Sequence, residues 1–155
     1  MRPGTRSLGI CLALCLMTAC SRSYATSQAG LPTGALTITT VGSEAVVTVE
    51  IAETEATREV GLMGRTDLAP DAGMVFLFED PFQGGFWMKN TLIPLSIAFW
   101  DTNGRIVGIL DMQPCETDTC PTYAPQKPYV GAVETNLGYL AEHDVKVGDT
   151  VVLDR

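Results

Sequence analysis

Basic residues are scarce in this 155-residue chain, which has 10 lysines and arginines against 18 aspartates and glutamates. The net charge at pH 7 is therefore −8. Two of the basic residues, Arg2 and Arg6, lie in a segment that we expect to be removed, which leaves a balance of 8 − 18 = −10. Such an acidic surface repels phosphate backbones, so the composition argues against nucleic-acid binding.

The residues that most often build catalytic or metal sites are also few. The single histidine, His143, cannot be combined with the sequence around it into a Ser-His-Asp arrangement. Gly84-Gly85 leads into an expected strand and not into a helix, unlike a phosphate-binding loop. The methionines of the domain are widely spaced and favour core packing over a copper site: Met63, Met74, Met88 and Met112. The sequence predicts neither a metal site nor a cofactor.

Long hydrophobic runs are absent too. Leu8–Ala19 has twelve residues, whereas a membrane-spanning helix needs about 20. A short apolar run behind two arginines is typical of a signal peptide, which we assign to residues 1–19. The run ends directly at Cys20, and Leu16-Met17-Thr18-Ala19-Cys20 resembles the lipobox of bacterial lipoproteins. The resemblance implies an acylated Cys20 at the mature N-terminus, held at the membrane of the cell envelope.

A second cleavage point follows Ala25 and would give a secreted or periplasmic protein without a lipid. Residues 20–33 are rich in Ser, Ala, Thr and Gly, so we expect a flexible tether. Residues 34–155 then form one domain. The sequence does not indicate an oligomeric state.

Two cysteines remain in the domain once the leader is removed and Cys20 is acylated. Cys115 and Cys120 form an even pair in an exported chain, which favours a structural disulfide. The alternatives are a redox-active pair, which is more often spaced Cys-x-x-Cys, and a metal pair, which would need two more ligands.

The domain consists mostly of expected strands. Ala35–Val41 and Ala45–Ala52 form a hairpin around Gly42-Ser43. Gly73–Glu79 is apolar on both faces and fits an interior strand. The other expected strands are Phe86–Thr91, Leu95–Asp101, Arg105–Met112, Tyr129–Glu134 and Thr150–Leu153.

Two local signals complete the pattern. We expect Thr54 to be the N-cap of a helix that runs to about Met63 and ends at Gly64, and we expect a helical turn at Asn136–Glu142. Asn103-Gly104 predicts a two-residue type I′ hairpin. Together the elements predict a mainly β fold, a compact β-sandwich or barrel-like domain with one or two short helices.

Several stretches together resemble the domain-of-unknown-function family 192. They are Arg58–Arg65, Gly73–Phe78 and Phe86–Leu95, and the resemblance extends from about Leu36 to Leu153. It implies a compact β-sandwich or barrel-like domain that is often exported, and it implies no established activity or catalytic residue. At Ser96 the family usually has an aspartate, so a role for a carboxylate at that position is not expected here.

Six residues are candidates for ligand binding: Trp87, Lys89, Asn90, Arg58, Arg65 and Glu134. On a strand, Trp87 and Lys89 would share a face, so an indole could stack on a ligand while the ammonium holds an anionic or hydroxylated group. The alternative is a Trp–Lys packing pair on the surface. The arginines suit either a surface ion pair or a ligand carboxylate. Glu134 closes an apolar strand and suits an exposed end, an ion pair or a catalytic acid.

These observations favour a lipid-anchored cell-envelope domain that binds a small polar or anionic ligand without catalysis. One alternative is an envelope enzyme that acts on a glycan or acyl substrate through Lys89 with Glu134 or an arginine. The other is a purely structural interaction domain.

Overall fold

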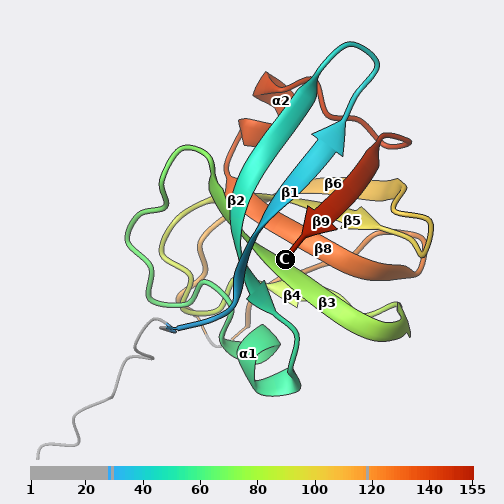
Figure 1. The fold of residues 1–155 in the computed structure, drawn as a ribbon. Helices are drawn as coiled ribbons and strands as arrows, with labels where there is room; N and C mark the ends of the chain where they lie inside the picture. Colours follow the sequence, from blue (N-terminus) through green and yellow to red (C-terminus); the bar gives the residue numbers. More distant parts are fainter. Residues whose placement is uncertain (1–27, 29, 118) are drawn as a thin grey trace, which may run out of the picture.

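The protein is described by a computed structural model that covers residues 28, 30–117 and 119–155. The strands are β1 (Thr33–Thr39), β2 (Glu44–Ala52), β3 (Ala72–Phe82), β4 (Phe86–Trp87), β5 (Leu95–Trp100), β6 (Ile106–Met112), β7 (Thr122–Tyr123), β8 (Tyr129–Asn136) and β9 (Thr150–Asp154), and the helices are α1 (Glu55–Val60) and α2 (Tyr139–Glu142). The mainly β prediction with two short helices is confirmed (Figure 1). The expected signal peptide, Cys20 and the cleavage point after Ala25 lie outside the described residues.

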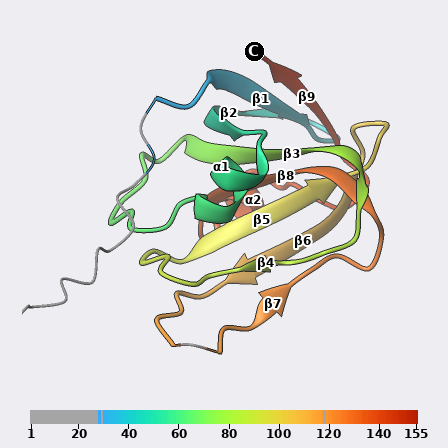
Figure 2. The same ribbon diagram turned by 90° about the horizontal axis from the view of Figure 1, so that it is seen from below.

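One sheet of seven strands dominates the domain, in the order β6-β5-β8-β3-β2-β1-β9. The sheet curls until its two edge strands meet at one end, where Arg105 bridges to Thr150. Backbone hydrogen bonds continue this contact, because Ile106 N donates to Asp149 O over 2.8 Å and Val151 N donates to Gly104 O over 2.8 Å. The result is a half-barrel, which is the barrel-like form of the predicted fold (Figure 2).

Each face of the sheet has its own apolar core, and the side chains of β5 alternate between the two. The first core, which α2 closes, includes Leu36, Ile38, Val47, Val75, Ala98, Trp100, Val133 and Leu140. The second core, which the chain around Leu62 and Met88 covers, includes Met74, Phe76, Leu95, Ile97, Phe99, Met112 and Tyr129. Burial on both faces stabilises β5 and its neighbours at the centre of the sheet.

Helix α1 begins as predicted but ends one turn early. Thr54 is the N-cap, and its side chain exchanges hydrogen bonds with Thr57 in a capping box. The helix ends at Val60, because Gly61 takes a positive φ of 49° there. The prediction that it reaches Met63 and ends at Gly64 is therefore wrong. The early end turns the following residues back over the second core.

The predicted strand Phe86–Thr91 is wrong beyond its first two residues. β4 stops at Trp87, and the chain turns at Asn90, which has a positive φ of 57°. Thr91 N donates to Met88 O over 3.1 Å and closes the turn. The expected alternation of faces is lost in consequence, so Trp87 and Lys89 do not share the face of a strand.

The hairpin between β5 and β6 is confirmed, but its turn is not the predicted type I′. A type I′ turn needs positive φ at both central residues, and of this turn only Gly104, at 69°, has one. Gly104 N donates to Asp101 O over 2.9 Å, one residue earlier than predicted. The Asp101 side chain sets this geometry, because its Oδ1 accepts from the backbone N–H groups of Arg105 and Asn103. The bond from Arg105 helps to hold the pKa of Asp101 below its usual value.

Cys115 and Cys120 form the predicted disulfide, with a Cα–Cα distance of 5.8 Å. The bridged loop lies against the turn after β4, where Asn90 N donates to Cys115 O over 3.1 Å. The chain that carries Trp87 is also fixed by pairing with β7, in which Trp87 faces Thr122. The disulfide loop and β7 together therefore brace the segment that follows β3.

Candidate functional site

A small cleft of about 30 Å³ opens between α1 and β4, on the side of the sheet that carries the second core. One wall is formed by the end of α1 and the turn after it, from Arg58 to Met63. The opposite wall is formed by Phe86, Trp87 and Thr91, and the sheet contributes Phe76 and Glu134. Three elements that are distant in sequence therefore meet here: α1, the β4 segment and strands β3 and β8.

Glu134 is the most unusual residue of the cleft. It lies on β8 between Met74 of β3 and Ile97 of β5, both fully buried, and only 4% of its own surface is exposed. Among the described residues it has no hydrogen-bond or ion-pair partner, and burial alone raises its pKa from 4.5 to about 8. At neutral pH the side chain is therefore mostly a neutral carboxylic acid. Two of the alternatives for Glu134, an exposed strand end and an ion pair with Lys89 or an arginine, are therefore not observed among the described residues.

The aromatic wall contributes two rings, Phe86 and Trp87, to the same cleft as this acid. Phe86 packs edge-on against Phe76, with ring centroids 4.9 Å apart. Trp87 is 50% exposed at the opening, while Met88 next to it is fully buried and anchors the segment. The wall therefore joins the second core at its inner end and reaches solvent at Trp87.

Arg58 lines the cleft, but its guanidinium is held elsewhere. Nη1 donates to the backbone carbonyls of Glu53, over 2.7 Å, and Leu77, over 2.8 Å. The guanidinium carbon lies 4.8 Å from the centre of the Phe78 ring. None of these three partners is among the residues that line the cleft in the described structure. Arg58 therefore fixes α1 against β3, and its charge does not offset the burial of Glu134.

The structure brings Trp87, Arg58 and Glu134 together, but it does not bring the other three candidates to the same place. Lys89 Nζ donates to Thr117 O over 3.0 Å, toward the disulfide loop. Asn90 occupies the exposed turn after β4. Arg65 binds both carboxylate oxygens of Glu50 through Nη2, at 2.7 Å each, as the surface-pair alternative predicts.

The six candidates did not include several lining residues, among them Glu59, Phe76, Phe86 and Thr91. Phe76 lies in an interior strand among other apolar residues, so the sequence does not distinguish it from an ordinary core residue. Thr91 follows the Trp-Met-Lys-Asn run and is buried because the chain turns there. Both lie within stretches that resemble the family, and that was the one available signal.

Ser96 lies away from the cleft and has a carboxylate beside it after all. Its Oγ donates to Oδ1 of Asp111 over 2.6 Å and accepts from Gly138 N at the start of α2 over 3.0 Å. Ser96 and Asp111 face each other across β5 and β6. The acid is supplied from the neighbouring strand, and these contacts hold α2 to the sheet.

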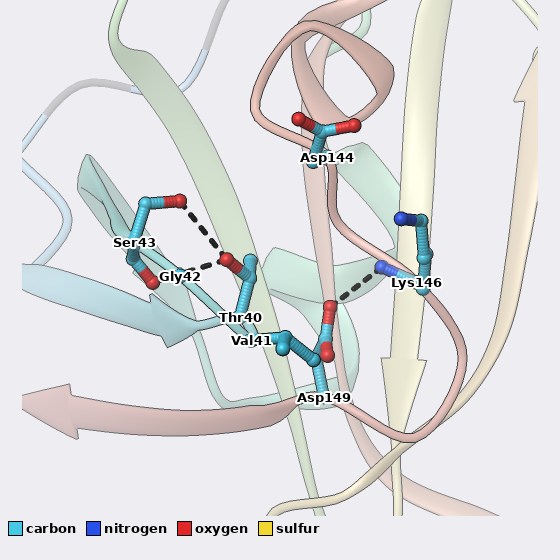
Figure 3. A pocket seen from close by; sticks show the side chains of 7 residues that line it. All are labelled: Thr40, Val41, Gly42, Ser43, Asp144, Lys146 and Asp149. Atoms are coloured by element: carbon cyan, nitrogen blue, oxygen red, sulfur yellow. Dashed lines mark hydrogen bonds between the residues drawn. The ribbon is translucent and has the colours of Figure 1, made fainter.

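A larger hollow of about 390 Å³ lies between the β1–β2 turn and the loop before β9 (Figure 3). Some of its polar groups bond one another: Thr40 to Ser43, and the Lys146 backbone N–H to Asp149. Val41 at its rim is fully exposed. We place the candidate site at the smaller cleft, because a buried carboxyl group without a described partner lies there and not in the larger hollow.

The chain forms a half-barrel whose second core is covered by the segments around Leu62 and Met88. The chain belongs to the DUF192 family, described as "Uncharacterized ACR", whose model matches residues 36–153. In the part of the chain that the structure describes, no helix is both long and apolar enough to cross a membrane.

Two solved structures are similar over most of the chain. A "putative transcription regulator" from Sinorhizobium meliloti 1021 has 29% identity and a TM-score of 0.74, covering 82% of this chain and 98% of that one. A protein of unknown function from Novosphingobium aromaticivorans DSM 12444 has 33% identity and a TM-score of 0.73, covering 83% and 94%. No curated protein matches the chain.

Proposed function

We propose that this domain is a binding module whose cleft takes the head of a small polar ligand, held by the carboxyl group of Glu134. The observation that carries the proposal is a buried acid without a described partner at a cleft that reaches solvent. Burial penalises the charged form of this carboxyl group, so an apolar side chain such as leucine would serve folding better at this position. A ligand that bonds to Glu134 turns this cost into affinity.

Binding is favoured over catalysis because Glu134 is the one buried titratable group among the described residues of the cleft, whereas Glu59 is exposed on α1. The enzyme alternative pairs Glu134 with Lys89 or an arginine. The Lys89 ammonium contacts Thr117 O outside the lining residues, and the Arg58 guanidinium is held by two carbonyls. A raised pKa suits a general acid, but acid catalysis needs a second group in reach of the substrate. The remaining alternative, a structural interaction domain, gives no role to a buried acid.

The cellular setting that we propose is the bacterial cell envelope, with the domain held at the membrane by an acylated Cys20. The disulfide supports an oxidising compartment. The net charge of −8 opposes binding to nucleic acid, so we do not carry over the description of the Sinorhizobium meliloti protein. Secretion after cleavage behind Ala25 is the alternative.

We expect the intact mass of the mature protein to show an acylated Cys20 at the N-terminus. The protein should be in the membrane fraction, and Cys20→Ala should release it or leave it unprocessed, because the thiol is the point of lipid attachment. An unmodified N-terminus at Thr26 would contradict the lipid anchor and leave ordinary secretion. This result would not bear on the cleft.

We expect small polar compounds that bind the wild type to bind Glu134→Leu at least about tenfold more weakly, a loss of about 1.4 kcal/mol. The measurement is a screen of neutral, anionic and cationic fragments by thermal shift. Each hit is then titrated into the protein while the fluorescence of Trp87 is followed. Glu79→Leu is the matched control, because Glu79 is exposed and lies outside the cleft. Equal binding to Glu134→Leu, or no hit with the wild type, would contradict the proposed function.

A further inference from the structure

The charges at the cleft favour a cation as its occupant. Glu134 lies on the sheet side, and Glu59, on the exposed side of α1, adds a second acid among the lining residues. The positive group of the lining, the guanidinium of Arg58, is directed to the carbonyls of Glu53 and Leu77. The flanking residues of Glu134 on the neighbouring strands, Met74 and Ile97, are apolar and carry no charge.

The aromatic side chains add to this preference. Phe76, Phe86 and Trp87 are all among the lining residues, and the first two pack edge-on at an interplanar angle of 84°. Cations are attracted to the negative faces of aromatic rings, and tryptophan is the strongest of these partners. Aromatic rings beside a carboxyl group are a common way to hold an ammonium group. A carboxylate ligand would meet two acids and these ring faces instead.

The size of the cleft limits how much of the ligand enters. A volume of about 30 Å³ fits a small head group and not a whole sugar or peptide. We propose that the ligand is a small organic cation, a primary or methylated amine, whose ammonium head lies between Glu134 and the rings of Phe86 and Trp87. This inference rests on the proposed function and names the class of ligand.

Binding of a cation requires a change at Glu134. In the free protein the carboxyl group holds its proton, because burial raises its pKa to about 8. An ammonium group in contact favours the carboxylate, so the proton leaves to the solvent as the cation enters. The charges then balance inside the cleft. A neutral ligand would leave the proton in place, and an anion would require it.

The test compares cations with neutral molecules of the same shape. Choline and butylammonium are titrated by calorimetry at pH 6 and pH 8, beside 3,3-dimethylbutan-1-ol and butan-1-ol, which lack the charge, and butyrate, which reverses it. We expect the two cations to bind about 50-fold more tightly at pH 8, the ratio of the ionised fractions for a pKa of about 8. Titration at pH 6 in two buffers should show release of about one proton per ligand.

Variants identify the residue. Glu134→Gln keeps the shape and the neutral form but cannot ionise, so cation binding should weaken and lose its pH dependence. Glu79→Gln, at an exposed site outside the cleft, should behave as the wild type. Equal affinity for choline and its neutral isostere, or tighter binding of butyrate, would overturn the cation class while the proposed function stands. Binding by none of the five probes would overturn the cation class as well, and hits elsewhere in the fragment screen would still support the proposed function.

Discussion

Raising the pH from 4.5 to 8 should destabilise the wild-type domain through Glu134. The unfolded chain ionises this carboxyl group near 4.5, whereas the folded domain keeps it protonated up to about 8. The folded state therefore binds the proton more tightly. The contribution of this bound proton to stability is fully present below pH 4.5 and is lost as the pH rises through 8. The expected slope is about 1.4 kcal/mol of unfolding free energy per pH unit within that interval.

Glu134→Gln should remove this slope, because glutamine does not titrate. Urea denaturation of both proteins at intervals between pH 4.5 and 8.5 isolates the effect, since every other titrating group is common to them. At pH 8 the variant should be the more stable by several kcal/mol. Glu79→Gln should keep the wild-type slope, because Glu79 is exposed. Parallel pH profiles for the wild type and Glu134→Gln would contradict the burial of an unpaired acid.

Gly131→Ala should destabilise the domain by about 3 kcal/mol or more. Gly131 lies on β8 opposite Trp100 of β5, and an added Cβ would overlap the Trp100 indole. The indole is only 6% exposed in the first core, so it has no free space into which to move. Strand β8 also carries Glu134, three residues further on, so the displacement should disturb the cleft as well.

The control is Gly42→Ala, in the turn between β1 and β2. An added Cβ there has no neighbour within 4 Å, so we expect a change of under about 0.5 kcal/mol. Thermal melts of the two variants and the wild type compare the positions, at about 4–8 °C per kcal/mol for a small domain. A melting temperature for Gly131→Ala equal to that of Gly42→Ala would show that the sheet adapts around Trp100.

Much of the fold is visible in the sequence because alternation reports burial. Val47, Val49 and Ile51 alternate along β2, and both faces of β5 are apolar, so these strands are predicted close to their observed bounds. The order of strands is not visible in the same way. β2 and β3 pair in parallel with α1 in the connection, whereas the other neighbours in the sheet are antiparallel. That arrangement depends on how α1 packs, which no local pattern encodes.

The cleft was predictable only in part. Trp87, Arg58 and Glu134 stand out as residue types, and the structure places all three around one cleft. The predicted pairing of Trp87 with Lys89 assumed a continuous strand, but β4 ends at Trp87 and Lys89 lies in the turn that the bond from Thr91 N to Met88 O closes. Whether Glu134 has an ion-pair partner depends on the tertiary structure. The nearest of its expected partners, Lys89, is 45 residues away in sequence. No periodicity can reveal such a distance.

The most direct measurement is the titration of Glu134 itself by NMR, through the side-chain carboxyl ¹³C resonance, with the spectrum of Glu134→Gln to assign it. If the cleft holds a buried acid without a partner, this resonance keeps the shift of a protonated carboxyl group at neutral pH and moves with a midpoint near 8. A cation that occupies the cleft should then lower the midpoint. A resonance that titrates near 4.5 in the free protein would mean that Glu134 is solvated or paired, and the cleft would lose the feature on which its proposed role depends.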